Sequence, residues 1–257
     1  GTGGIYEELW LLDENRASVG AVTRGCAFAA EVVQGLAAKD ILLDEQPQNV
    51  PDLRPLFARV EPHVLVGPTC LSLLRVFSVF RRRARDAGEY NAEERQHIDA
   101  LLEAVNRTPV MRRCRAEAAK MRGTDWTDVA WEQELWQMWF QQHGGRCAFQ
   151  HVFVGEASTD STGRGTVGGF HNWFKFYLEE KCGSARYLGQ RYPGRTTEEE
   201  GVLNPSFVSG RFSWDLDGTR LIKDVGGFFV GISPEWHLAM ATTAFFETEL
   251  AERAAAR

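Results

Sequence analysis

Apolar side chains recur at helical spacing through most of the first half of the chain, so several helices are expected there. The expected helices cover residues 7–13, 70–87, 91–105, 111–122 and 128–142. Thr69 and Asn91 precede two of them and are residue types that cap helix N-termini. A shorter amphipathic segment, residues 56–60, ends before Pro62. This half is therefore predicted to be mainly helical.

The pattern changes in the second half. Residues 149–154 read Phe-Gln-His-Val-Phe-Val, a composition that favours a strand. The polar, glycine-rich residues 155–169 indicate a loop, and the aromatic-rich residues 170–181 are compatible with a helix that ends at Gly183. Residues 187–200 show no regular pattern.

A β-hairpin and a final helix are expected near the end of the chain. Residues 207–214 alternate between apolar and polar side chains, and Asp217-Gly218 is a typical hairpin turn before a return strand. Ser233 followed by Pro234 is an N-cap with proline at the first helical position, which predicts a helix to about Glu252.

The expected domain boundary lies near Gly144-Gly145, where the pattern changes. Residues 1–144 form a predicted helical N-terminal region, and residues 145–257 form a predicted region of mixed strands and helices. A chain of 257 residues has room for one large or two small domains. The fold class is expected to be α+β.

Composition places the chain among ordinary globular proteins. Apolar residues make up 44% and charged residues 25%, which is enough for a core and excludes global disorder. No apolar run approaches the roughly 20 residues that a membrane-spanning helix needs, and residues 1–4 show no signal peptide. The sequence therefore indicates no membrane partner, and it leaves the compartment and the oligomeric state open.

Charge and cysteine content narrow the function classes further. A net charge of −6 argues against a protein that coats nucleic acid, but not against an enzyme that grips a few phosphates. The arginine-rich residues 81–85 and 112–115 are expected to be solvated faces or patches for an RNA backbone or a partner. The cysteines form no CxxC pair, so buried free thiols or a disulfide framework are expected rather than a metal knuckle. They are Cys26, Cys70, Cys114, Cys147 and Cys182.

Two of the six histidines differ from the rest in their surroundings. His151 lies in the expected strand, and His171 follows a Gly-Gly-Phe break and opens the expected helix. Two imidazoles joined by a strand–loop–helix connection suit paired acid and base catalysis. Buried histidines whose hydrogen bonds are all made within the core show the same sequence pattern. His63, His97 and His143 lie in polar surroundings, which indicates surface positions. His237 lies in the expected last helix, where a core position, a surface position and a site position are all open.

The blocks around these two histidines resemble the histidine motifs of the EndoU (poly(U)-specific, XendoU-like) endoribonuclease family. The blocks are Phe149-Gln150-His151-Val152-Phe153-Val154-Gly155-Glu156 and Gly169-Phe170-His171-Asn172-Trp173. Lys223, with the glycine-rich segment before Ser233-Pro234-Glu235, is similar to the family's lysine motif. The N-terminal half is similar too, at Glu8-Leu9-Trp10, Asp13, Asn15, Arg16, Leu56-Phe57, Val60 and residues 136–140.

The resemblance implies a fold and a set of site residues. The implied fold is α+β, a helical N-terminal region followed by a catalytic region of small antiparallel sheets flanked by helices. The implied catalytic residues are His151, His171 and Lys223, and the implied supporting or substrate-binding residues are Gln150, Glu156, Asn172 and Gly227. Glu156 is expected to orient a catalytic histidine or bind a metal, and by spacing alone it is a strand-end acid.

The implied reaction is cleavage of single-stranded RNA by its own 2′-OH, which leaves a 2′,3′-cyclic phosphate and a 5′-OH. It needs a base for the 2′ proton, an acid for the 5′ oxygen and a cation for the charge on the phosphorane. His171 is assigned as the base because a helix N-terminus disfavours its protonated ring, His151 as the acid and Lys223 as the cation. These steps require no cofactor, and Mn²⁺ is expected only from the resemblance.

The chain departs from the family pattern at several positions. Gln150 stands where the family usually has Glu, and Gly227 stands where it usually has a Ser that helps to read uracil. The loop at residues 158–165 is longer than in the family, and residues 247–257 do not match its last pair of strands. Some uridine preference is expected, less sharp than in typical members. A second hypothesis stays open: a catalytically weakened domain that binds RNA or serves as a subunit of a larger assembly with protein partners.

Overall fold

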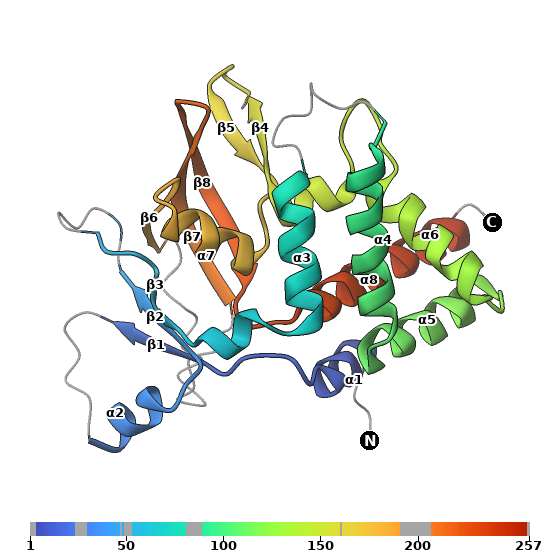
Figure 1. Cartoon of the computed structure of the whole chain (residues 1–257), viewed down its shortest axis with the longest axis horizontal. Coiled ribbons are helices and arrows are strands. Elements are labelled where there is room, and N and C mark those ends of the chain that lie inside the picture. The colour runs from blue at the N-terminus through green and yellow to red at the C-terminus, as the bar shows by residue number, and fades with distance from the viewer. Residues whose placement is uncertain are drawn as a thin grey trace.

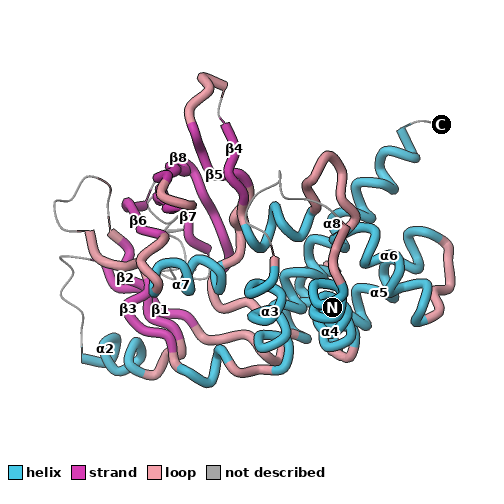
Figure 2. The backbone as a smooth tube through the Cα atoms, turned by 45° about the horizontal axis from the view of Figure 1, so that its top comes forward, coloured by secondary structure: helices cyan, strands magenta, loops and turns pink. Residues whose placement is uncertain are grey.

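The computed structural model describes residues 4–23, 30–46, 48, 53–80, 89–159, 161–190 and 207–255. Most helices gather on one side of the molecule, and the strands form two sheets on the other (Figures 1 and 2). Together they make the predicted α+β fold. Cys26, the arginine-rich residues 81–85 and residues 191–200 lie outside the described residues.

The helical part is formed mainly by the first half of the chain, as predicted, and is completed by the last helix. Its helices are α1 (Ile5–Leu12), α3 (Pro68–Val79), α4 (Ala92–Asn106), α5 (Pro109–Arg122), α6 (Asp128–Phe140) and α8 (Pro234–Ala255). Asn91 caps α4 through a capping box with Glu94, as its residue type predicts. Thr69 does not cap α3, because the helix already begins at Pro68, and proline suits the first helical position.

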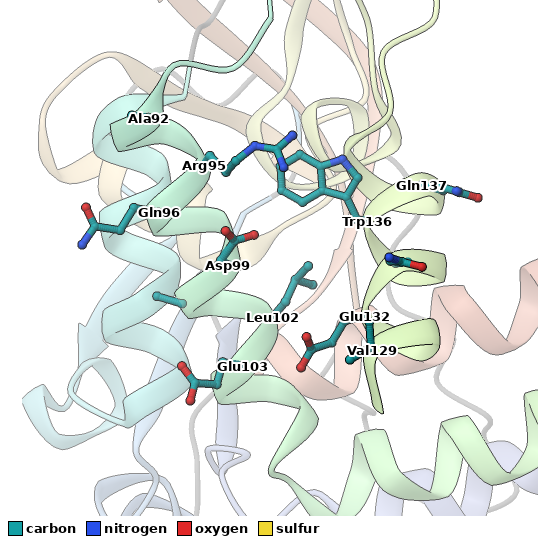
Figure 3. Close-up of a pocket in the computed structure, with 12 residues that line it drawn as sticks. Ala92, Arg95, Gln96, Asp99, Leu102, Glu103, Val129, Glu132, Trp136 and Gln137 are labelled. Carbon is teal, nitrogen blue, oxygen red and sulfur yellow. The ribbon is translucent and has the colours of Figure 1, made fainter. Parts of the chain in front are cut away.

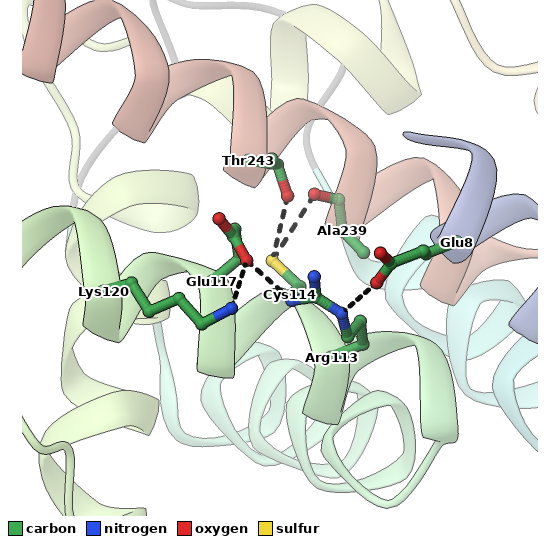
Figure 4. Close-up of polar contacts among 7 residues, drawn as sticks. All are labelled: Glu8, Arg113, Cys114, Glu117, Lys120, Ala239 and Thr243. Carbon is green, nitrogen blue, oxygen red and sulfur yellow. Dashed lines mark hydrogen bonds and ion pairs between the residues drawn. The ribbon is translucent and has the colours of Figure 1, made fainter. Parts of the chain in front are cut away.

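Helix α8 packs against α5 and also contacts α1, α3 and α4, so the C-terminal helix lies among the N-terminal ones (Figure 1). Within this contact, the Cys114 sulfur lies 3.5 Å from both the Thr243 hydroxyl and the Ala239 carbonyl oxygen (Figure 4). Arg113 binds Glu8 of α1 at 2.5 Å, so this part of an arginine-rich stretch anchors one helix to another. None of the described helices, α8 included, is long and apolar enough to cross a membrane.

The described cysteines are free thiols. Cys70, Cys114 and Cys147 are buried, as predicted, whereas Cys182 is exposed. Burial raises the pKa of the Cys114 thiol to about 12, so this group stays protonated at neutral pH.

The N-terminal region also contains a three-stranded sheet that the sequence pattern did not predict. Strand β1 (Val19–Thr23) pairs in parallel with β2 (Ile41–Glu45) through the helix α2 (Ala30–Ala37), and β3 (Phe57–Val60) is antiparallel to β2. The expected amphipathic segment at residues 56–60 is therefore mostly a strand. These strands are only 4 or 5 residues long, which is too short for their periodicity to distinguish strand from helix.

The second sheet has the strand order β4-β5-β8-β7-β6. Its strands are β4 (Glu156–Thr159), β5 (Gly165–Gly168), β6 (Ala185–Gln190), β7 (Phe207–Leu216) and β8 (Thr219–Phe229). The β7–β8 hairpin is confirmed, and Asp217 and Gly218 adopt the positive φ angles, 49° and 79°, that its tight turn requires. Helix α7 (Trp173–Lys181) packs on one face, where Phe176 contacts Phe212 and Phe228.

Three expectations for the second half are wrong because side-chain packing and strand pairing override local propensity. Residues 150–154 form a π-helix instead of a strand, since Phe149 stacks on Phe153 at helical spacing, with ring centroids 4.8 Å apart. The expected loop at residues 155–169 contains the paired strands β4 and β5. Residues 187–190, expected to be irregular, belong to β6, which pairs with β7.

The loop after α1 is fastened to the start of α8. The Asp13 carboxylate accepts a hydrogen bond from the Ser233 backbone N–H at 3.2 Å, and the Asn15 amide donates to the Glu235 carboxylate at 2.5 Å. Burial raises the pKa of Asp13 to about 6. These contacts join the N-terminal motif to the segment that follows β8, and they hold the helical part against the larger sheet.

Candidate active site

The structure brings together the three residues that the sequence singled out as catalytic candidates. His151 lies on the π-helix and His171 directly precedes Asn172, the N-cap of α7, and the centroids of the two imidazole rings are 5.9 Å apart. Lys223 lies on β8, and its positive charge is near enough to lower the pKa of His171. Three separate elements therefore supply one cluster.

The backbone between the two histidines fixes their spacing. The Phe170 N–H donates to the His151 carbonyl oxygen at 2.8 Å, and the His171 N–H donates to the Val152 carbonyl oxygen at 2.8 Å. A Cβ on Gly169 would lie 1.8 Å from the His151 oxygen, so only glycine permits this approach. Phe170 adopts a φ of 68°, and its fully buried ring holds that unfavourable backbone in place.

His151 is paired with a buried carboxylate. Its Nδ1 atom lies 3.3 Å from Oε1 of Glu156, while 52% of the His151 side chain is exposed. A carboxylate can only accept a hydrogen bond, so Nδ1 is the donor in this contact and Nε2 is left for other partners. Arg146, which the sequence pattern did not reveal, approaches the second oxygen of Glu156 at 3.8 Å.

His171 has the geometry of a general base. Its Nδ1 atom lies 2.9 Å from the carbonyl oxygen of Gly227. Since a carbonyl oxygen can only accept, Nδ1 carries the proton and Nε2 keeps a free lone pair. Burial lowers the pKa of this ring, the charges of Lys223 and His151 lower it further, and the bond to Gly227 opposes the shift. Burial therefore favours the neutral ring.

Lys223 extends from β8 toward the neighbouring strand β5. Its Nζ atom donates to the Val167 carbonyl oxygen at 3.2 Å. Burial lowers the pKa of Lys223, and the negative charge of Glu156 acts in the opposite direction. Glu156 therefore contacts His151 and also favours the charged form of Lys223.

A buried histidine lies behind the site. Asn172 caps α7 by accepting a hydrogen bond from the Lys175 N–H at 2.9 Å, and its amide nitrogen points to Nδ1 of His237 at 3.3 Å. Burial lowers the pKa of His237 to about 3, and the charge of His171 adds to this effect. His237, for which the sequence left core, surface and site open, is therefore a neutral core residue that holds Asn172.

Gln150 and Gly227 both neighbour the candidate catalytic residues. Gln150 is buried and directly precedes His151. Gly227 pairs with Ser209 in the β7–β8 ladder. A Cβ on Gly227 would lie 2.9 Å from Cζ of Phe207. The ring of Phe207 therefore occupies part of the space that a serine side chain at position 227 would need.

The described residues do not form a metal site. Among them, no group of three or more His, Cys, Asp or Glu side chains is arranged to hold a metal ion. The buried Oε2 atom of Glu156 has no hydrogen bond, but the side chain that approaches it is Arg146, a cation. One carboxylate oxygen beside an arginine is not a donor set that fits Mn²⁺.

The other histidines and a large groove lie apart from this cluster. His63 and His143 are exposed, and His97 is partly exposed, as their polar surroundings predicted. A groove of about 1290 Å³ lies between α4 and α6, where Arg95 covers the ring of Trp136 at 4.4 Å (Figure 3). None of the candidate catalytic residues lines this groove.

Comparison with known proteins gives a match over nearly the whole chain. The family model described as Endoribonuclease XendoU matches residues 3–254. Uridylate-specific endoribonuclease C of Danio rerio is 30% identical over 256 residues, which cover 94% of this chain and 75% of the relative. Uridylate-specific endoribonuclease B of Danio rerio is 28% identical over 248 residues, which cover 94% of this chain and 82% of the relative.

Two further comparisons show how much of each related protein the chain covers. The uridylate-specific endoribonuclease of Homo sapiens is 29% identical over 198 residues, and the match spans only 45% of its length. The solved structure described as "The structure of XendoU: a splicing independent snoRNA processing endoribonuclease" superposes with a TM-score of 0.68 at 24% identity. That superposition covers 94% of this chain and 81% of the other, and it shows a shared fold.

Proposed function

Because the chain belongs to the XendoU endoribonuclease family, we propose that it cleaves single-stranded RNA with some preference for uridine. The proposed reaction is attack of a ribose 2′-OH on the adjacent phosphorus, which gives a 2′,3′-cyclic phosphate and a 5′-OH. The observation that carries this proposal is the pair of imidazole rings 5.9 Å apart beside Lys223. The uridylate-specific and poly(U)-specific names of the relatives support the choice of substrate.

His171 takes the 2′ proton in this proposal. Its Nδ1–H is held by Gly227, so the lone pair on Nε2 is the group available to the 2′-OH. Burial keeps the ring neutral near pH 7, which a base requires before the reaction begins.

His151 donates a proton to the 5′ oxygen as the P–O bond breaks. Glu156 accepts the hydrogen bond from Nδ1, so the proton on Nε2 is the one transferred. Half of this side chain is exposed, as contact with a leaving group requires. After the reaction His171 holds one more proton and His151 one fewer, and exchange with water restores both.

Lys223 stabilises the negative charge that builds up on the phosphorane. Its ammonium group is fixed by the Val167 carbonyl oxygen at 3.2 Å. A partly buried cation stabilises developing charge more strongly than one in water, and it need not reorganise during the reaction.

A second candidate function is RNA binding with little cleavage. Gln150 favours it, since this buried neutral side chain directly precedes His151 where the family usually has a carboxylate. An amide cannot stabilise an imidazolium as a carboxylate does, which leaves that task to Glu156.

A cleavage assay separates the two candidates. The protein is incubated with a fluorogenic oligoribonucleotide, with Mn²⁺ or with a chelator, beside a His171→Ala control. The proposed activity predicts cleavage by the wild type and an end bearing 2′,3′-cyclic phosphate by mass spectrometry. RNA binding without cleavage above the control, under both conditions, would support the second candidate and contradict the first.

A further inference from the structure

The face of the β7–β8 hairpin that points away from α7 carries two aromatic side chains. Phe207 pairs with Phe229, and Ser209 pairs with Gly227, so these four residues share one face of the two strands. The intervening residue Phe228 is buried against α7, on the opposite face. We call the first four residues, Phe207, Ser209, Gly227 and Phe229, the aromatic platform.

Phe207 is the exposed ring of this platform, and neighbouring aromatic rings pack against it from the protein side. It is 47% exposed, although it is a large apolar side chain. Its ring lies edge-to-face on Phe229 with centroids 5.0 Å apart, and Phe229 in turn contacts the buried Trp236 at 5.8 Å. The ring therefore has fixed neighbours on the protein side and a free surface on the other.

Gly227 connects the aromatic platform to the catalytic cluster. Its carbonyl oxygen holds Nδ1 of His171 at 2.9 Å. The same residue lies beneath Phe207, since a Cβ on Gly227 would be 2.9 Å from Cζ of that ring. An exposed aromatic ring and the proposed base thus share one glycine as a neighbour.

The strands that carry the platform also carry a cluster of charged side chains. Arg211 follows Ser209 on β7, and its Nε atom binds Asp224 of β8 at 3.0 Å. Arg164 binds the other oxygen of Asp224 at 2.8 Å. Single-stranded nucleic acid is held by base stacking on aromatic rings and by cationic contacts to its phosphates, and this hairpin carries both residue types.

We infer that Phe207 is the stacking platform for a base next to the phosphate that is cleaved, an inference that rests on the proposed function. Stacking needs only the π-face that every base presents, so this contact holds purines and pyrimidines alike. Phe207 then supplies affinity that is independent of the base, and the strictness of any uridine preference has to come from other groups.

A binding experiment tests the inference without relying on cleavage. The probe is a short oligoribonucleotide with one deoxyuridine at the cleavage position, which removes the attacking 2′-OH, and 2-aminopurine as the neighbouring base on either side. In the wild type, 2-aminopurine fluorescence should be quenched in one of the two placements. Phe207→Ala should abolish the quenching and weaken binding about 10-fold, the usual contribution of one stacked base.

Matched variants separate stacking from other effects. Phe207→Tyr should behave like the wild type, and Phe207→Leu, which keeps apolar bulk without a π-face, should behave like Phe207→Ala. Phe245→Ala is the control, because Phe245 on α8 is also 47% exposed. Melting temperatures close to that of the wild type would show that the variants fold.

The outcomes distinguish this inference from the proposed function. Cleavage by the wild type together with unchanged binding and quenching in Phe207→Ala would overturn the inference and leave the function standing. Loss of quenching and binding in Phe207→Ala by a chain that never cleaves would support base stacking on Phe207 and overturn the proposed cleavage. Full rescue by Phe207→Leu would also overturn the inference, since apolar bulk alone would then suffice.

Discussion

His171 donates its Nδ1 proton to the carbonyl oxygen of Gly227 across 2.9 Å. The two residues are far apart in the sequence, and the contact forms because the start of α7 is held beside β8. It fixes the tautomer in which Nε2 can accept a proton. Gly227 contributes through its backbone, so this contact does not depend on a side chain at that position.

Removing either imidazole should remove most of the activity. His171→Ala and His151→Ala should each lower the cleavage rate by about 10²- to 10⁴-fold, the usual contribution of a positioned base or acid. His63→Ala is the control, since this side chain is 68% exposed and pairs with Asp40 instead of with the cluster. Single-turnover cleavage of one oligoribonucleotide measures all three variants. A loss in His63→Ala as large as in the others would contradict the assignment.

Lys223→Ala should act on turnover more than on binding. The charge of Lys223 matches the phosphorane, which carries more negative charge than the ground state, so kcat should fall while KM changes little. Steady-state kinetics would measure both constants. If RNA binding weakened and turnover at saturation stayed the same, Lys223 would be a binding residue rather than a stabiliser of the transition state.

The pKa of His171 should lie below the ordinary histidine value of about 6.5, because the ring is buried beside two cations. As the base must be unprotonated, kcat/KM should rise with pH through that lowered pKa. Lys223→Ala removes a positive charge, so the pKa of His171 should move up. Titration of the His171 ring by NMR in both proteins checks the direction, and a downward move in Lys223→Ala would contradict it.

His237 should make stability depend on pH. Its pKa is about 3 in the folded chain and about 6.5 when unfolded, so between these values the unfolded state binds the extra proton. The stability from the neutral ring is therefore complete above pH 6.5 and is lost as the pH falls toward 3. The slope is up to about 1.4 kcal/mol per pH unit.

Urea unfolding at several pH values measures this dependence. The comparison variant is His237→Gln, which does not titrate and retains an oxygen that can accept from Asn172. Its unfolding free energy should fall less steeply with acid than that of the wild type. Equal slopes in the two proteins would show that the pH dependence comes from other groups.

Gly227→Ser should weaken base stacking on Phe207 and strengthen recognition of the base edge. The new Cβ would lie 2.9 Å from Cζ of Phe207, so the ring must move away, and RNA binding should weaken. The hydroxyl adds a polar group at the position that the family resemblance assigns to uracil recognition, so the preference for uridine should sharpen. Cleavage of matched oligonucleotides with one ribonucleotide each measures the preference. Strict uridine cleavage by the wild type would place discrimination in other residues.

A double variant serves as the control for this exchange. In Phe207→Ala the obstructing ring is absent, so adding Gly227→Ser should cost no further affinity while still sharpening the preference. An added loss of affinity in the double variant would show that the serine disturbs His171 itself.

Local signals were sufficient for much of this fold. The Asn91 capping box, the Asp217-Gly218 turn and the Ser233-Pro234 helix start each act within a few residues, so the sequence alone predicts α4, the β7–β8 hairpin and α8. The motifs around His151, His171 and Lys223 are also visible in the sequence, and they indicate the cluster without the tertiary structure. The domain boundary near Gly144-Gly145 stays a prediction.

Side-chain packing and strand pairing decided the rest. The short strands β1 to β5 needed their pairing partners, and the π-helix that carries His151 depends on the stacking of Phe149 on Phe153. No local pattern places Phe207 over Gly227 or directs Asn172 to His237, since each pair lies on elements that meet only after folding. The sequence therefore identified the residues that we propose carry the chemistry, and tertiary packing determined their tautomers, their pKa shifts and the aromatic surface beside them.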